Sequence, residues 1–185
     1  MSRNEIALES VTMIRENLDD IPDHTFGPGY SIRWYQPGDE KLWLEIQSRA
    51  DVYAKVNADL FKKEFGSDVE TLSKRQCFLN DGTSKTIGTA SAWFGHLAGR
   101  PLGRIHWIAI RPEEQGKGLA KPLLATVCNR LRSLGHSRVY LTTQTVRLPA
   151  INLYAKFGFT PVIDSEADRQ IWTRLQRQIK CPLHL

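Results

Sequence analysis

Two glycines, Gly116 and Gly118, stand between a predicted strand and a predicted helix, in a segment that also carries Lys117 and Lys121. Glycine lets backbone N–H groups approach an anion closely, and a helix N-terminus adds the positive end of its dipole. The spacings of a P-loop and of a dinucleotide-binding loop are both absent. The segment therefore predicts a loop that holds a phosphate-bearing ligand, or, on a simpler interpretation, only a tight turn.

A second motif lies at residues 150–159, where a short predicted helix ends at Gly158. Ala150 and Tyr154 share one face of this helix and Leu153 and Phe157 another, so one face can pack while the other meets a ligand. A phenol stays protonated at neutral pH, which makes Tyr154 a candidate proton donor. A half-buried core tyrosine would explain the same residue without any catalytic role.

His106 is the candidate base, because it precedes Ile108 by two residues and shares its face on a predicted strand. Arg104 lies on that face as well, and its charge disfavours a protonated imidazole. The alternative is a buried histidine with no function.

Together, in this order and at this separation, the two motifs resemble the signatures of the GNAT superfamily of acetyl-CoA-dependent N-acetyltransferases. The family's loop reads Q/R-x-x-G-x-G/A, and its second signature reads A-I-x-L-Y-x-K-x-G-F. The matching positions are Pro112, Gln115, Gly116, Gly118 and Leu119 for the loop, and residues 150–159 for the second signature. Two positions depart from the family: Glu113 replaces the first Gln or Arg of the loop, and Arg147 stands where many members have Asn.

The resemblance implies that acetyl-CoA binds as a co-substrate, that Tyr154 is the general acid and that His106 is a candidate base, while a water chain is the alternative base. It implies no metal. The strand before the loop is implied to splay from its neighbour, so that the backbone N–H of Ile108 can stabilise an oxyanion. The positions implied in acetyl-CoA binding are Ile108, Ala109, Ile110, Gln115, Gly116, Lys117, Gly118, Leu119, Ala120, Lys121, Asn152 and Lys156. The candidates for the acceptor site are Tyr53, Trp93, Phe94 and His96, which ordinary core packing would explain equally well.

These motifs require a sheet and helices to position them. Hydrophobic spacing and turn residues predict strands at 30–35, 76–79, 86–94, 104–110, 138–142, 159–163 and 170–175, and helices at 6–18, 39–57, 61–74, 115–134 and 149–157. This order predicts a mixed α/β sheet in one domain. The resemblance implies a mostly antiparallel central sheet flanked by helices, with splayed strands at the cofactor site. Residues 1–27 are expected to be a helical N-terminal extension ahead of an N-acetyltransferase domain at 28–185.

Composition narrows the class of protein. The chain has 185 residues, of which 41% are hydrophobic, and no apolar run reaches the ~20 residues of a membrane span. The first residues do not read as a secretory signal, and three scattered cysteines indicate a reducing compartment, so we expect a cytoplasmic protein. The net charge is +5, residues 1–27 carry −4, and residues 100–147 carry +7. The basic segment suits a polyanion such as coenzyme A.

The expected function is transfer of an acetyl group from acetyl-CoA to a primary amine of a small molecule. One alternative acceptor is a protein or peptide amine, and another reading is a non-catalytic sensor of acyl-CoA. A nucleic-acid-binding domain is disfavoured, because the chain lacks a recognition helix rich in Arg, Asn and Gln. The expected partners are acetyl-CoA and the amine, with no nucleic acid and no membrane, and a homodimer is left open.

Overall fold

A computed structural model describes residues 7–183 and contains one seven-stranded sheet with the order β2-β3-β4-β5-β6-β1-β7. The strands are β1 (Ser10–Arg15), β2 (Ser31–Trp34), β3 (Gln76–Asn80), β4 (Thr86–Leu97), β5 (Arg100–Ile110), β6 (Val139–Gln144) and β7 (Thr160–Pro161). Every neighbouring pair is antiparallel except β5 and β6, which are parallel. The expected α/β fold, with a mostly antiparallel sheet, is confirmed.

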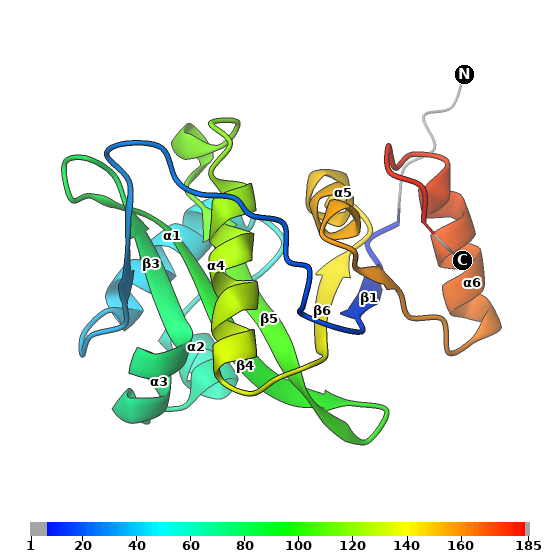
Figure 1. The fold of residues 1–185 in the computed structure, drawn as a ribbon, viewed down its shortest axis with the longest axis horizontal. Coiled ribbons are helices and arrows are strands. Elements are labelled where there is room, and N and C mark those ends of the chain that lie inside the picture. Colours follow the sequence, from blue (N-terminus) through cyan, green and yellow to red (C-terminus); the bar gives the residue numbers. More distant parts are fainter. Residues whose placement is uncertain (1–6, 184–185) are drawn as a thin grey trace.

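Helices cover both faces of the sheet. They are α1 (Glu40–Ala50), α2 (Ala58–Phe65), α3 (Val69–Arg75), α4 (Ala120–Ser133), α5 (Leu148–Lys156) and α6 (Glu166–Gln176), with a short 3-10 turn, η1 (Pro112–Glu114). Figure 1 shows α4 in front of β3–β5 and α5 in front of β6, with α1 and α2 behind the sheet. One apolar core lies under α4, α5 and α6, and a second, aromatic core lies between α1, α2 and the sheet.

The sheet splays between β5 and β6. The two strands pair only at Gly103 with Val139 and at Arg104 with Tyr140. From residue 105 onward β5 has no partner on the β6 side among residues 7–183, although its other edge stays paired with β4 as far as Ile110. The expected splay is therefore present, and it leaves the backbone of the last part of β5 open on one edge.

The expected helix at residues 6–18 is wrong for residues 7–18. Residue 6 lies outside the described residues. Residues 10–15 form β1, which pairs with β6 and β7, so this segment supplies a strand of the central sheet rather than an extension ahead of it. Val11, Met13 and Arg15 are the buried residues of the strand, which is the period of two of a strand and not a helical spacing. Arg15 is buried because its guanidinium donates to the backbone carbonyls of Asn17 and Asp20.

The expected strand at residues 170–175 is also wrong, because residues 166–176 form α6. Ser165 caps this helix by accepting a hydrogen bond from the Asp168 backbone N–H at 3.1 Å. Trp172 and Leu175 are buried three residues apart, as on one helix face. The expected helix at 61–74 is divided at Gly66, whose φ of +73° no helix accommodates.

The remaining elements differ from expectation mainly at their ends. Helix α1 ends at Ala50 rather than near residue 57, and α4 starts at Ala120 rather than at residue 115. Pro122 consequently falls in the first turn of α4, where a helix has N–H groups without intrahelical partners and tolerates proline.

Candidate active site

A cavity of about 560 Å³, called the larger cavity here, lies between the splayed end of β5, the loop before α4, and α5. Eleven of the twelve positions expected to bind acetyl-CoA line it: Ile108, Ala109, Ile110, Gln115, Gly116, Gly118, Leu119, Ala120, Lys121, Asn152 and Lys156. Segments about 30 residues apart in sequence therefore come together around one space. The exception is Lys117, which is absent from the lining.

The loop before α4 contributes two glycines to the lining of the larger cavity. Gly116 and Gly118 have φ values of +80° and +81°, a region that side chains disfavour, and a Cβ at either position would have nothing within 4 Å. Gln115 fixes the start of the loop because its Nε2 donates to the carbonyl of Ile110 at 2.9 Å. Helix α4 then begins at Ala120, so its N-terminal N–H groups lie beside the cavity.

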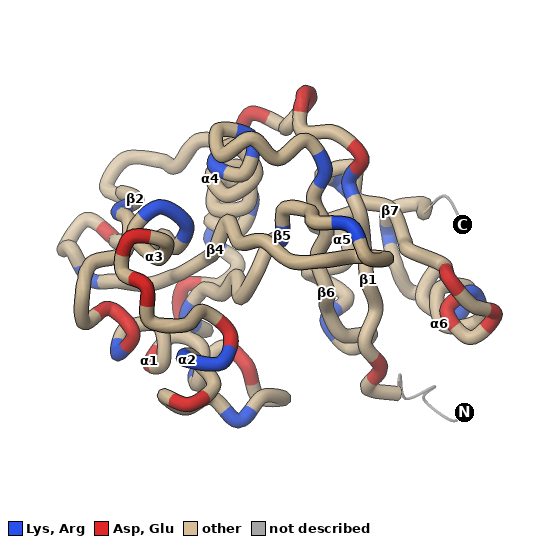
Figure 2. Tube along the Cα trace, turned by 90° about the horizontal axis from the view of Figure 1, so that it is seen from below, with Lys and Arg blue, Asp and Glu red and all other residues tan. Residues whose placement is uncertain are grey.

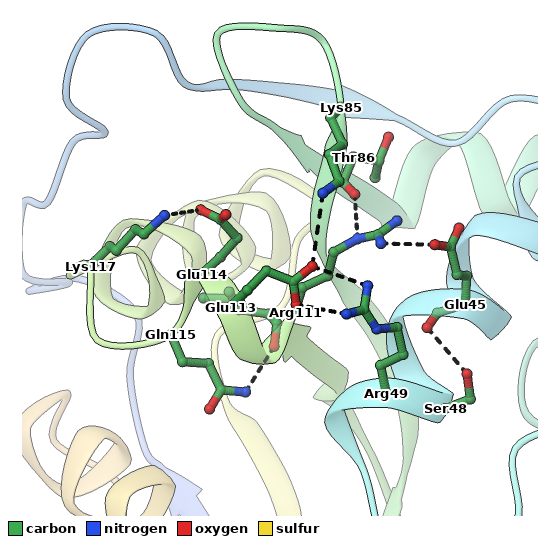
Figure 3. A network of polar contacts seen from close by, with 11 residues as sticks. Glu45, Ser48, Arg49, Lys85, Thr86, Arg111, Glu113, Glu114, Gln115 and Lys117 are labelled. Carbon is green, nitrogen blue, oxygen red and sulfur yellow. Dashed lines mark hydrogen bonds and ion pairs between the residues drawn. The ribbon is translucent and has the colours of Figure 1, made fainter.

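A network of ion pairs behind the loop holds it in place, as Figure 3 shows. Glu113, the departure from the family's loop signature, pairs with Arg49 of α1 at 3.0 Å and with Lys85 at 3.8 Å. Lys117 pairs with Glu114 at 2.8 Å instead of facing the cavity. The departure at position 113 therefore ties the loop to α1 and to the segment before β4.

Arg111 is a second anchor of the loop and is buried at the end of β5. Its Nε donates to the Thr86 carbonyl at 2.8 Å, and its Nη1 lies 2.8 Å from a carboxylate oxygen of Glu45 (Figure 3). Because Nε and Nη1 both have partners, the Arg111 side chain fixes the direction in which the chain leaves the sheet.

Lys121 and Lys156 are the lysines that line the larger cavity, one from α4 and one from α5. Figure 2 shows Lys and Arg positions on both of these helices. Asn152 also lines the cavity, but its side chain is engaged: Nδ2 donates to the Leu148 carbonyl, and Oδ1 accepts from the backbone of Lys180 at 2.7 Å. Its amide thus ties the C-terminal segment to α5.

A smaller cavity of about 270 Å³ adjoins the larger one and is lined by residues of both β5 and β6. Polar and charged side chains from β1, α1, α2, β5, β6 and the segments after α1 and before α5 line it: Ser10, Gln47, Asp51, Glu64, Arg104, His106, Thr142, Thr143, Gln144 and Arg147. Trp107 and Ile108 contribute from β5 and Tyr154 from α5. The charged groups make this space suited to a polar molecule.

Five residues line both cavities and so mark where the two meet: Gln47, Asp51, Ile108, Arg147 and Tyr154. Tyr154 is only 6% exposed, and burial raises the pKa of its phenol to about 12, against a lowering effect of Arg147. The hydroxyl therefore stays protonated across the physiological pH range.

Trp107 produces a bulge in β5 at this junction. Thr89 of β4 pairs with Ala109 and Ser91 with His106, so β5 holds one residue more than β4 between these pairs. Trp107 adopts a φ of +49°, which is uncommon for an aromatic residue. The buried Gln47 stabilises the bulge, because its Nε2 donates to the Trp107 carbonyl at 2.8 Å. The bulge sets the orientation of the next residue, Ile108.

His106 is buried beside the smaller cavity, with its Nε2 2.8 Å from Oε2 of Glu64, although the two groups are not aligned for a hydrogen bond. Burial lowers the pKa of His106, Glu64 opposes that effect, and Arg104 adds to it in the expected direction. Pairing with His106 lowers the pKa of Glu64 to about 2. A neutral imidazole beside a carboxylate can accept a proton.

Sequence reasoning missed Gln47, Asp51 and Glu64, and treated Arg147 only as a departure from the family pattern. Arg147 pairs with the buried Asp51, with Nη2 to Oδ2 at 2.6 Å, and its Nε donates to Gln144 at 3.1 Å. The motif around residue 150 could have directed attention to Arg147. No comparable signal existed for residues on α1 and α2, whose spacing in the sequence reveals only a helix face.

The expected acceptor residues do not line either cavity. Trp93 is buried in the aromatic core against Phe65. Phe94 stacks on Trp93, with the two ring centroids 5.1 Å apart. His96 follows on the hairpin of β4 and β5, and Tyr53 is half exposed beyond Arg147, whose guanidinium lies 5.8 Å from its ring. These four positions therefore lie outside both cavities, and their role in an acceptor site stays a prediction.

Within residues 7–183 no three His, Cys, Asp or Glu side chains gather as metal ligands would. In the same range, none of the helices combines the length and the apolar character that crossing a membrane requires.

A family model described as "Acetyltransferase (GNAT) family" matches residues 32–159. Proteins named mycothiol acetyltransferase are similar in sequence. That of Thermobispora bispora is 30% identical over 162 residues, which cover 80% of this chain and 52% of the relative. That of Pseudarthrobacter chlorophenolicus is 27% identical over 151 residues, covering 76% of this chain and 46% of the relative. The chain thus spans about half the length of the curated relatives it matches.

Solved structures show the same fold. A GCN5-related N-acetyltransferase from Sphaerobacter thermophilus superimposes with a TM-score of 0.68 at 21% identity, covering 84% of this chain and 49% of that one. The ribosomal-protein-S18-alanine N-acetyltransferase from Escherichia coli gives a TM-score of 0.58 at 19% identity, covering 72% of this chain and 79% of that one.

Proposed function

We propose, since the chain belongs to the acetyltransferase (GNAT) family, that it transfers the acetyl group of acetyl-CoA to the primary amine of a small molecule. The observation that carries the proposal is the meeting of two cavities at Tyr154 and Ile108. One contains the open strand edge of β5 and the glycine loop, and the other is lined by charged side chains. A donor in the first and an acceptor in the second would meet at this junction.

The larger cavity fits acetyl-CoA by its chemistry. The backbone from Gln115 to Ala120 and the N-terminus of α4 would hold the pyrophosphate, because both present N–H groups to an anion. Lys121 and Lys156 would add positive charge. The unpaired edge of β5 at residues 108–110 would hydrogen-bond the pantetheine amides, as a strand would.

Two groups at the junction would lower the barrier to transfer. As the amine nitrogen bonds to the acetyl carbon, negative charge develops on the carbonyl oxygen, and the backbone N–H of Ile108 would stabilise it. The carbon–sulfur bond then breaks and the electron pair leaves with sulfur. Tyr154 would donate its O–H to that sulfur as general acid, and the phenolate would then regain a proton from water. Because the phenol has a pKa of about 12 and an ordinary thiol about 8.5, the hydrogen bond itself contributes much of the effect.

His106 would take the proton that the attacking amine loses. Burial keeps its imidazole neutral at pH 7 and therefore able to accept a proton, and the neighbouring Glu64 stabilises the imidazolium that forms. The same carboxylate can also attract the ammonium form of the acceptor before its deprotonation.

The small size and the polar lining of the smaller cavity support a small acceptor over a protein. Its volume of about 270 Å³ is near the lower limit of roughly 300 Å³ for ordinary ligand pockets. The related proteins are named for mycothiol and not for a protein acceptor. A non-catalytic acyl-CoA sensor would not need a buried phenol and a histidine–carboxylate pair at the junction.

The decisive test is release of free thiol from acetyl-CoA by a panel of amines that includes polyamines, amino acids, aminoglycosides, arylalkylamines and short peptides. We expect release with a small polar amine and formation of an equal amount of its N-acetyl product by mass spectrometry. Release with peptides alone would favour a protein acceptor. Tight acetyl-CoA binding without release by any amine would favour the sensor.

A further inference from the structure

We propose that the acceptor amine also carries a carboxylate, and that Arg104 binds this carboxylate at the far end of the smaller cavity. The inference rests on the proposed function, because it names the substrate class of the same site. It starts from the charges that line the smaller cavity, where the partners of three of the four ionised groups can be identified.

The buried pair of Asp51 and Arg147, at 2.6 Å, is complete within the protein. Glu64 is in contact with Nε2 of His106 and accepts a hydrogen bond from Nε1 of Trp107 at 3.3 Å. Arg104 remains. Its Nε is buried and has no hydrogen-bond partner among residues 7–183, and none of the ion pairs between those residues includes it.

An arginine in this situation requires a partner. The guanidinium is charged at every accessible pH and offers five N–H donors in a planar fork. The ring of Tyr140 lies 5.7 Å from Cζ and accepts none of those hydrogens in a regular hydrogen bond. The buried Nε–H lacks an acceptor, so a ligand that supplies one gains affinity from it. A carboxylate matches the fork with two parallel bonds.

The other charges of the cavity favour a zwitterion over a phosphate. With Asp51 and Arg147 neutralising each other, the uncompensated pair is Glu64 and Arg104, one negative and one positive. An ammonium beside Glu64 and a carboxylate beside Arg104 complete both. A phosphate dianion would leave an excess negative charge in a small space that already contains two carboxylates.

The length of β5 between Arg104 and Ile108 determines the distance between the carboxylate and the amine of a fitting acceptor. Arg104 precedes Ile108 by four residues on β5, which places their Cα atoms about 13 Å apart along an ordinary strand, less what the bulge at Trp107 removes. The amine must reach the junction, and the arginine side chain bridges only part of the remaining distance. Amino acids with several bonds between amine and carboxylate should therefore fit better than α-amino acids.

The test compares each amino acid with the amine that lacks its carboxylate: glycine with methylamine, β-alanine with ethylamine, and γ-aminobutyrate with propylamine. We expect a preference for the acid of at least about tenfold in kcat/KM, largest for γ-aminobutyrate. Arg104→Gln should remove this preference without changing the KM for acetyl-CoA, and Arg104→Lys should retain part of it. Arg174→Gln, which alters an arginine paired with Glu9 outside both cavities, is the matched control and should keep the full preference.

Equal kcat/KM for acids and amines, or an undiminished preference in Arg104→Gln, would overturn the inference. Calorimetry with γ-aminobutyrate and propylamine in the presence of CoA gives a readout that does not need turnover. If no amine releases thiol but the acid binds at least tenfold more tightly than the amine, and only when Arg104 is present, the proposed function fails and the acid site stands. If the acid and the amine bind equally, the acid site fails whatever the activity.

Discussion

The two cavities are lined by different kinds of residue. The larger one contains the unpaired edge of β5, two glycines with positive φ and the first turn of α4, together with residues of α5. The smaller one is lined by polar side chains of β1, α1, α2, β5, β6 and the segments after α1 and before α5, and four of these side chains are Asp, Glu or Arg. Only five residues, Tyr154 among them, belong to both.

This difference separates what each cavity can specify. The strand edge and the glycine loop of the larger cavity would recognise features common to all acyl-CoA molecules, and they depend on the strand splay and on the two glycines. The smaller cavity would change its preference with single substitutions, because charged side chains line it. Mutations should therefore affect donor binding and acceptor choice separately, and only the residues at the junction should affect turnover itself.

The junction gives the largest expected effect. Tyr154→Phe removes one hydroxyl and keeps the ring, and kcat should fall by roughly 10²- to 10⁴-fold, the usual contribution of general acid catalysis. The dissociation constant of acetyl-CoA should stay within about twofold, because the hydrogen bond strengthens mainly as charge develops on sulfur. Since the phenol pKa is about 12, the wild-type kcat profile should show no basic limb from this group below about pH 10. Steady-state kinetics and calorimetry on the two proteins provide the check, and an unchanged kcat would remove the acid role from Tyr154.

The base side of the junction gives a pH-dependent effect. His106→Gln should lower kcat at pH 7 by roughly 10²-fold, with partial recovery as pH rises and free amine accumulates. In Glu64→Gln the carboxylate that raises the pKa of His106 is lost, so that pKa falls further and the acidic limb of the kcat profile should move to lower pH. A limb that stays in place in Glu64→Gln, or normal activity in His106→Gln at pH 7, would point to a water chain as the base.

The larger cavity should respond to its glycines. Gly118→Val forces a β-branched residue to φ +81° and occupies space reserved for the ligand, so the acetyl-CoA dissociation constant should rise at least about tenfold. Gly135→Val is the control, because Gly135 has a φ of +84°, an equally open surrounding, and a position at the far end of α4. It should lose stability in thermal unfolding while binding acetyl-CoA normally. Equal binding by both variants would contradict the phosphate-loop assignment.

The smallest effect on acetyl-CoA binding is expected at Lys117, which the sequence predicts to bind acetyl-CoA but which does not line the larger cavity. Lys117 pairs with Glu114 and is absent from the cavity lining, whereas Lys121 lines it. Lys117→Ala should change the acetyl-CoA dissociation constant by less than about twofold. Lys121→Ala should weaken binding several-fold at low salt and by less at high salt, because salt screens the charge interaction that is lost. Titrations at low and high ionic strength distinguish the two. A larger loss in Lys117→Ala would restore this lysine to the phosphate site.

The same contrast explains what could be predicted from the sequence. Two short sequence motifs contain Gly116, Gly118 and Tyr154. Each motif lies next to the helix that it helps to position, so these residues can be identified from the sequence. Asp51, Glu64 and Arg104 meet only because α1, α2 and β5 pack together, and no local spacing encodes that. The first strand and the last helix were misassigned for a related reason: β1 is buried by pairing with β6 far along the chain, and short apolar runs fit either period.

The central claim is that a donor and an acceptor meet at Tyr154, in two spaces that are continuous there. The direct test is the affinity of a conjugate in which CoA is joined through its sulfur and an acetyl spacer to the nitrogen of an accepted amine. If the cavities are continuous, the second moiety binds at a high effective concentration, and the conjugate should bind at least about 100-fold more tightly than CoA. A conjugate that binds no more tightly than CoA itself would contradict the account.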